Sequence, residues 1–414
     1  MIDQSSHASD VDGRRPSPPA RPHLIRDDQE ALDVAARLAE RFVVGASERD
    51  AKRLLPWAEI DEYTASGLGG VTIPKAFGGA DVSNVTLAKV FEILCRADPA
   101  LGQIPQNQFG VLALLKDVGS DAQKARIFGD VLNKGFRIGN AGPEKKTKSV
   151  AVSTTLLRST PDGLRLTGRR FYSTGAIFAH WIPTRAVDEE GRAVQVWAAY
   201  DAPGVTVIDD WSSFGQRTTA SGSVKFADVP IDPELVFPVW SYADRPGLAG
   251  PISQLVQASI DSGIAAAAVG DAVAFVRDRA RPWVDSGVSS AIDDPTIIHS
   301  VGSLYTDLHA AQAVLYEAAE TIDRIARDKV TDALSAIASV AVAEAKILTT
   351  EIALAATEQL FDLAGSSATR EAHNLGRHWR NARVHTLHDP VRWKYHLIGK
   401  YELTGAYPAR HQWN

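Results

Sequence analysis

RRFYSTGAIFAHWIP (residues 169–183) and DDWSSFGQRTTASGSVKFADVPI (residues 209–231) are the two stretches that decide the fold. Each contains or adjoins a short run in which apolar and polar side chains alternate, a pattern typical of half-buried strands. Similar runs surround them, and the turn sequences PDG, DEEG and DAPG separate the runs. These runs are STTLLRST (153–160), LRLTGRRFYS (164–173), VQVWAAY (194–200) and GVTVI (204–208). We therefore predict a β-domain over residues 135–245.

The sequence on both sides of this β-domain has the period of an amphipathic helix. LIRDDQEALDVAARLAERFV (24–43) places its apolar residues on one helical face, and DVSNVTLAKVFEILCRADP (81–99) begins with a capping candidate, Ser83 or Asn84. After residue 246 the chain returns to long alanine-rich helical stretches. We predict an N-terminal helical domain over 24–134 and a C-terminal helical bundle over 246–414. Residues 1–23 are expected to form a disordered leader.

Composition narrows the class of protein. The chain has 414 residues, 45% of them hydrophobic, with a net charge of −6 and a pI of about 6.0, which excludes a general affinity for nucleic acid or an anionic membrane. The N-terminus lacks the apolar centre of a signal peptide, and no apolar run approaches the roughly 20 residues that span a bilayer. The single cysteine, Cys95, lies in an apolar run and cannot form an internal disulfide. We expect a cytoplasmic globular protein.

RNARVHTLHDPVRWKYH (380–396) gathers His385, His388, Asp389 and His396 near the C-terminus. A metal site needs three or four ligands, so the H-x-x-H spacing alone does not indicate one, and we predict no metal. A histidine can instead accept and donate protons near neutral pH. A structural network at a helix end, with Arg383 and Asp389, is the alternative.

The order of helices, β-domain and helices, together with the two opening stretches and NAGPEKKTK (140–148), resembles the acyl-CoA dehydrogenase superfamily. The resemblance implies an α+β acyl-CoA dehydrogenase fold with an N-terminal helical domain, a central β-barrel-like domain and a C-terminal four-helix bundle. Many members carry a C-terminal glutamate that removes a proton from a thioester, and HTLHDPVRW has none. RHWRNARVHTLHDP is instead similar to the flavin-dependent monooxygenase branch, the dibenzothiophene monooxygenase-like and sulfur-acquisition oxidoreductases.

This branch implies a two-component monooxygenase that uses oxygen and reduced FMN, with FAD possible, supplied by a separate flavin reductase. The expected substrate is a small organosulfur compound. A homotetramer is implied as well, and the alanine-rich stretch 336–361 is apolar over a wide arc, as expected of an interface helix. The alternatives are an FAD-dependent acyl-CoA dehydrogenase and a non-catalytic, flavin-free relative.

The resemblance also assigns site residues. His388 is the first candidate to donate to the oxygen adduct of the flavin, with His385 beside it and Asp389 fixing its tautomer. Polar contacts to flavin or oxygen are expected from Asn140, Ser173 and Thr174, ring contact from Trp211, and phosphate contact from Arg279 or Arg281 across a subunit interface.

Simpler explanations exist for several of these residues. Arg279 and Arg281 could form a solvated helix end, Asn140 could cap a turn, and His378 and His396 are expected at a surface or interface. Two departures from the branch concern the active site. The loop Gly142–Pro143–Glu144–Lys145–Lys146 replaces a more flexible one, and Gln108 stands where relatives commonly have histidine.

Overall fold

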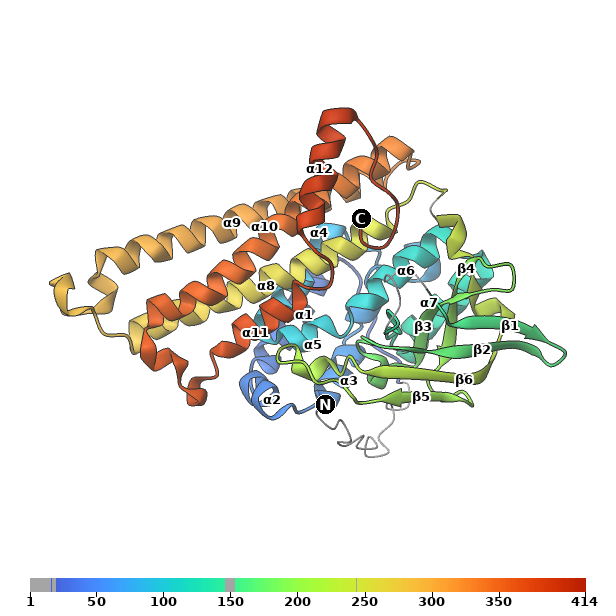
Figure 1. The fold of residues 1–414 in the computed structure, drawn as a ribbon, viewed down its shortest axis with the longest axis horizontal. Helices are drawn as coiled ribbons and strands as arrows, with labels where there is room; N and C mark the ends of the chain where they lie inside the picture. Colours follow the sequence, from blue (N-terminus) through green and yellow to red (C-terminus); the bar gives the residue numbers. More distant parts are fainter. Residues whose placement is uncertain (1–15, 17–19, 146–152, 243) are drawn as a thin grey trace, which may run out of the picture.

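The computed structural model describes residue 16 and residues 20–145, 153–242 and 244–414. The molecule is elongated, with long helices at one end and a sheet at the other (Figure 1). Of the predicted leader, residues 1–15 and 17–19 lie outside the described residues. The disorder predicted for residues 20–23 is wrong, because this segment packs against the first helices and the His23 amide donates to the Ala65 carbonyl at 2.9 Å.

Helices form the N-terminal part of the described chain, as predicted. Ser83 caps α4 by accepting a hydrogen bond from the Thr86 amide, which confirms one of the two capping candidates. The helices are α1 (Asp28–Phe42), α2 (Ala46–Lys52), α3 (Trp57–Ala65), α4 (Asn84–Ala97), α5 (Pro99–Gln103), α6 (Gln106–Val118) and α7 (Asp121–Lys134).

The central part is one mixed sheet with the strand order β5-β6-β2-β1-β3-β4-β7. Neighbouring strands are antiparallel, except that β1 pairs with β3 in parallel through Leu156 and Val187. The strands are β1 (Leu156–Thr160), β2 (Gly163–Arg170), β3 (Trp181–Val187), β4 (Ala193–Ala199), β5 (Val205–Ile208), β6 (Ser223–Ile231) and β7 (Val236–Phe237). Each alternating run of the sequence therefore contains a strand.

Long helices form the C-terminal part, and they pack side by side (Figure 1). The helices are α8 (Ala249–Asp278), α9 (Pro295–Ile325), α10 (Asp332–Ala364), α11 (Gly376–His385) and α12 (Arg392–Thr404). The expected α+β order of helices, sheet and helices is confirmed, with a mixed sheet in place of the barrel-like domain and α8–α12 in place of a four-helix bundle. The limits given to the three units remain a prediction.

Two of these helices are more apolar than the sequence pattern suggested. α8 and α10 are long and apolar enough to cross a membrane by length and composition, but most of their apolar residues are buried inside the protein. α10 contacts α8, α9, α11 and α12 of its own chain. Its wide apolar arc is therefore explained by packing within one chain, and it is not evidence for a subunit interface.

A cluster of buried charged and polar groups joins three of the C-terminal helices. Asp261 of α8 accepts from Lys346 Nζ of α10 at 2.6 Å and lies 2.5 Å from Nδ1 of His385 of α11. All three residues are fully buried, and Thr350 Oγ1 donates to the same carboxylate at 3.0 Å. Burial opposes ionisation of Asp261, but the Lys346 charge and the contact with His385 outweigh it and lower the pKa of this carboxyl. Asp261 is therefore an anion that fixes α10 and α11 to α8.

Asp261→Asn should lower the free energy of unfolding by roughly 3–5 kcal/mol, because it leaves the Lys346 ammonium buried without a counter-charge. Urea unfolding followed by circular dichroism measures the loss. Glu48→Gln is the control, since Glu48 pairs with Lys52 at 2.6 Å on the surface, where such pairs contribute at most about 1 kcal/mol. A loss for Asp261→Asn no larger than that of the control would contradict the assigned role.

Candidate functional site

A cavity of about 680 Å³ opens between the sheet and the helices. This volume lies in the range of pockets that hold cofactors and small substrates. Its walls come from segments far apart in the sequence: α5 and α6, the loop 140–144, β3, the segment 211–221, the first turns of α8, the end of α11 with residues 387–389, and the C-terminal residues 412–413. Of the predicted site residues, Asn140, Thr174, Trp211, His388 and Asp389 line it.

His388 lines this cavity, and each of its ring nitrogens has a different protein partner. Its Nδ1 lies 2.7 Å from the carbonyl oxygen of His385, and only an N–H can donate to a carbonyl, so the proton is assigned to Nδ1. Nε2 is then an acceptor, and the Gln103 side-chain amide donates to it at 3.1 Å. The ring surface is exposed toward the cavity, while desolvation by the surrounding protein lowers its pKa to about 4. His388 is therefore a neutral proton acceptor at pH 7, whereas the sequence-based expectation was a donor.

The contacts of His385 and Asp389 differ from those expected from the sequence. His385 is fully buried behind His388, and burial lowers its pKa. Its carbonyl, rather than Asp389, sets the His388 tautomer. Asp389 instead pairs with Lys394 at 3.6 Å, so its predicted contact with the His388 ring is wrong. Among the described residues, no group of three His, Cys, Asp or Glu side chains is placed to hold a metal.

Of the residues predicted to contact flavin, Asn140, Thr174 and Trp211 line the cavity. Thr174 Oγ1 lies 2.7 Å from Ser221 Oγ, and Trp211 Nε1 donates to the Gln216 carbonyl at 2.9 Å. Ser173, directly before Thr174, is buried. Asn140 makes only a long contact of 3.5 Å with the Tyr172 carbonyl, so its amide remains available to a ligand.

Buried polar atoms around the cavity fit a flavin. Buried side-chain polar atoms normally have hydrogen-bond partners. Within the described residues, the Ser173 hydroxyl and both polar atoms of the Gln216 amide have none. The same is true of side-chain carbonyl oxygens of Gln103, Gln106, Gln254 and Gln257. Together with the aromatic rings of Phe171, Tyr172 and Trp211, these amides and hydroxyls suit a flat ring system with polar edges.

Gln103 and Gln216 were missed by sequence reasoning. Gln103 ends α5, and only the fold brings it to His388, 285 positions later. Gln216 is fully buried with a left-handed backbone (φ 46°), a conformation that non-glycine residues rarely adopt and that is enriched at functional sites. For Gln216, the one signal of a functional role in the sequence was a polar residue in a segment that contains glycines.

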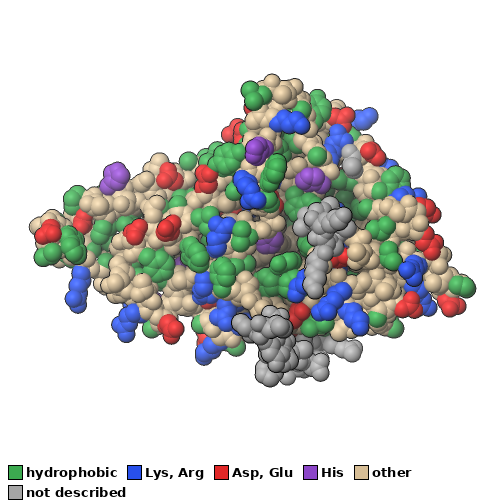
Figure 2. Space-filling model, viewed as in Figure 1, with side chains coloured by type: hydrophobic (Ala, Val, Ile, Leu, Met, Phe, Trp, Pro, Cys, Tyr) green, Lys and Arg blue, Asp and Glu red, His purple; other side chains and the backbone are tan. Residues whose placement is uncertain are grey.

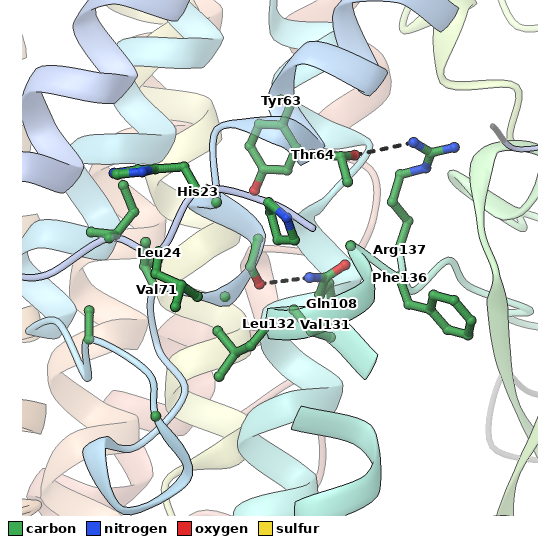
Figure 3. A pocket seen from close by; sticks show the side chains of 18 residues that line it. His23, Leu24, Tyr63, Thr64, Val71, Gln108, Val131, Leu132, Phe136 and Arg137 are labelled. Carbon is green, nitrogen blue, oxygen red and sulfur yellow. Dashed lines mark hydrogen bonds between the residues drawn. The ribbon is translucent and has the colours of Figure 1, made fainter. Parts of the chain in front are cut away.

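Gln108 does not face the large cavity. Its Nε2 donates to the Gly69 carbonyl at 2.7 Å, and its Oε1 accepts from the Ile138 amide at 3.0 Å. It lines a separate cavity of about 20 Å³, large enough for a single water molecule (Figure 3). The expected change of an active-site hydrogen bond at Gln108 is therefore wrong, because both ends of its amide bind the backbone.

Arg279 and Arg281 are exposed at the far end of α8. The cavity meets α8 at residues 253–257, and the 22 residues from Gln257 to Arg279 span about 33 Å of helix. Arg279 contacts His373 at 3.4 Å. These arginines cannot reach the cavity of their own chain, so their binding of a flavin phosphate stays a proposal that requires a second subunit.

Comparisons with known proteins agree with this geometry. The chain matches the acyl-CoA dehydrogenase N-terminal domain over residues 26–134 and the acyl-CoA dehydrogenase C-terminal domain over residues 255–393. It is 30% identical to a dibenzothiophene monooxygenase of Rhodococcus erythropolis, over 92% of this chain and 95% of the relative. It is 29% identical to the probable FMNH2-dependent monooxygenase SfnC of Pseudomonas putida, over 92% and 96%.

A solved structure shows that the similarity extends to the three-dimensional fold. FMN-bound TdsC from Paenibacillus sp. A11-2 superposes with a TM-score of 0.88 at 31% identity, covering 93% of this chain and 100% of that one. The matches extend over both helical parts and the sheet between them. This chain therefore belongs to the acyl-CoA dehydrogenase superfamily, in the branch that includes the dibenzothiophene monooxygenases.

Proposed function

We propose that this chain is a two-component, flavin-dependent monooxygenase that uses reduced FMN and oxygen to oxygenate a small organosulfur compound. The observation that carries the proposal is the position of His388, a neutral imidazole in the wall of the cavity that Asn140, Thr174 and Trp211 also line. The named activities of the relatives and the FMN in TdsC support the same reaction class. Bound reduced FMN would supply the electrons that activate oxygen.

The side chains divide this work between binding and proton transfer. We assign ring contact to Trp211 and polar contacts to Asn140, Ser173 and Thr174. His388 accepts a proton at Nε2 while Nδ1 stays bonded to the His385 carbonyl, and Gln103 orients the accepting nitrogen. A pKa of about 4 makes the protonated ring a ready acid, so His388 can return the proton later in the same turnover.

The dehydrogenase alternative needs a carboxylate base. The carboxyl groups that line the cavity, within the described residues, are Glu144 and Asp389. Burial opposes ionisation of Glu144, but hydrogen bonds from Thr154 and Thr155 outweigh it and lower its pKa to about 2. Asp389 is paired with Lys394. Glu144 is thus committed to other partners. Asp389 is paired through Oδ2 alone, and its Oδ1 has no hydrogen-bond partner among the described residues, so the acyl-CoA assay below tests the dehydrogenase directly.

We assign flavin reduction to a separate reductase, because the sequence contains no second dinucleotide-binding pattern. We place the enzyme in the cytoplasm, where its buried Cys95 would stay reduced.

The function is tested with an NADH-dependent reductase that supplies reduced FMN, oxygen labelled with ¹⁸O, and a panel of sulfides, sulfoxides and sulfinates. We expect one labelled oxygen in the product and no product without FMN. Acyl-CoA with an artificial electron acceptor is the parallel assay for the dehydrogenase. Turnover in that assay alone, or a failure to bind any flavin, would overturn the proposal.

His388→Ala should reduce oxygenation by roughly 10²–10⁴-fold, because a positioned proton-transfer group is lost. Reduced FMN should be consumed with release of hydrogen peroxide, while folding and FMN binding stay close to the parent. His396→Ala is the control, since the ring of this histidine lies 5.1 Å from that of Trp393 on α12 and does not line the cavity. Unchanged coupling of oxygen to product in His388→Ala would remove His388 from the mechanism.

The pH profile separates this role from a structural one. Because desolvation lowers the pKa of His388 to about 4, the accepting form persists to about pH 5 and is lost only as pH falls through 4. An unperturbed histidine would lose it near pH 6.5. The yield of product per reduced FMN, measured from pH 8 down to 4.5 with circular dichroism to monitor folding, should stay flat to about pH 5. A fall centred near pH 6.5 in folded protein would contradict the assignment.

We also propose a homotetramer, now supported by exposed apolar residues rather than by α10. Trp283, Val284 and Ile298 lie at the end of the long helices, and Trp393 and Leu403 on α12. Apolar side chains are exposed at both places (Figure 2). Exposed apolar side chains that lie close together mark sites where protein subunits associate.

Light scattering at micromolar concentration should give four times the chain mass. Val284→Glu should weaken the assembly, because it places a charge in the contact, while Val44→Glu, equally exposed near α1, should not. A monomeric parent protein would refute the tetramer.

A further inference from the structure

We propose that Arg185 binds the oxyanion of the substrate, so that the substrate class is an organosulfur acid such as a sulfinate; this deepens the proposed function and rests on it. Arg185 lies on β3, opposite Gln195 of β4, and both side chains line the large cavity.

Among the described residues, the Arg185 guanidinium uses one of its donors in a side-chain contact, to Gln412. Its Nη2 donates to the Gln412 side chain at 3.3 Å, and its central carbon lies 5.8 Å from the centre of the Trp413 ring. A guanidinium carries five N–H donors in a planar fork that matches two oxygens of an oxyanion. The contact with the aromatic face orients the fork without occupying it.

Arg185 is also the cation of this cavity that lacks an acidic partner among the described residues. Arg170 lies 3.4 Å from Glu144, and Lys394 lies 3.6 Å from Asp389. Within the part of the chain that the structure describes, Arg185 forms no ion pair, and burial lowers the pKa of its guanidinium. Since Glu144 pairs with Arg170 and Asp389 with Lys394, Arg185 has no counter-charge of its own. A partly buried charge of this kind is costly unless a ligand pairs with it.

Both a substrate oxyanion and the FMN phosphate could satisfy this charge. The contacts favour the substrate, because they connect Arg185 to the His388 side of the cavity. Arg185 contacts Trp413, the Trp413 carbonyl accepts from Lys394, and Lys394 pairs with Asp389, the neighbour of His388. We therefore place the anion in the cavity that Arg185 and His388 both line.

The reaction is balanced for a sulfinate. R–SO₂⁻, O₂ and FMNH₂ give R–SO₃⁻, FMN and H₂O: one sulfur–oxygen bond forms, the oxygen–oxygen bond breaks, and the second oxygen leaves as water with the two hydrogens of the flavin. Sulfur and flavin each lose two electrons, and oxygen gains four. Arg185 would hold the sulfinate oxygens and leave the sulfur lone pair directed into the cavity.

The test compares benzenesulfinate with methyl phenyl sulfoxide, in which a neutral methyl group replaces the anionic oxygen. Arg185→Gln should raise KM for benzenesulfinate by roughly 10- to 100-fold, the effect expected when hydrogen bonds to a charged group are lost. KM for the sulfoxide should change by less than about threefold, and Arg185→Lys should recover part of the sulfinate affinity. Arg158→Gln, an exposed arginine on β1, is the matched control.

Equilibrium binding provides a readout that is independent of turnover. Calorimetric titration with benzenesulfinate should show binding to the parent and strongly reduced binding to Arg185→Gln, with equal FMN affinity for both. Weakened binding of FMN but not of riboflavin would assign Arg185 to the phosphate and overturn the proposal. Equal damage to sulfinate and sulfoxide turnover would overturn it as well, since that pattern indicates a structural role.

Failure of the proposed function would be recognised separately. A parent enzyme that oxygenates the sulfoxide but neither binds nor oxidises the sulfinate refutes the Arg185 assignment and leaves the monooxygenase intact. A parent protein that oxygenates no sulfur compound refutes the proposed function, and the calorimetric comparison then still decides whether Arg185 binds this anion.

Discussion

The site depends on the contacts that the buried carboxylate of Asp261 makes. It binds Lys346 of α10 and His385 of α11 from its position on α8, so three helices converge on one anion. Fixing His385 also fixes the backbone carbonyl that accepts from His388 Nδ1. The proton on Nδ1 in turn leaves Nε2 as the acceptor nitrogen. The direction in which His388 transfers a proton is thus set through His385, by the contacts of Asp261 in the helical core.

Such a cluster is costly for stability alone, because apolar residues of similar volume often stabilise a core as well as buried ion pairs do. Its geometry suggests what it contributes instead. α11 is a short helix with few apolar residues, and His385 lies in its last turn. A hydrophobic contact would leave that turn free to rotate or slide, whereas two short contacts to a single carboxylate specify its position. We therefore interpret the cluster as a positioning device for His388.

Local patterns predicted the parts of this protein that depend on local physics. Alternation of apolar and polar residues with a period of two located the strands, and the helical period of apolar residues located the helices. The resemblance identified Asn140, Thr174, Trp211 and His388, which line one cavity. The missed contacts join positions that are distant in sequence. Asp261 is 124 residues from His385 and sits in an alanine-rich run that indicates only a core helix. Gln103 and Gln108 are separated in the sequence by little more than the length of one helical turn. Only the fold shows which of them contacts His388.

The charges of the cavity explain why a histidine is suited to the position that a glutamate holds in many dehydrogenases of this superfamily. Glu144 and Asp389 are each paired with a cation, which leaves the wall with the unbalanced charge of Arg185 and with neutral imidazoles. An additional carboxylate base would pair with Arg185 and repel an anionic substrate. A neutral imidazole does neither. If Arg185 binds an oxyanion, the bound anion lies in the cavity that His388 also lines, and its negative charge favours proton acceptance by the imidazole.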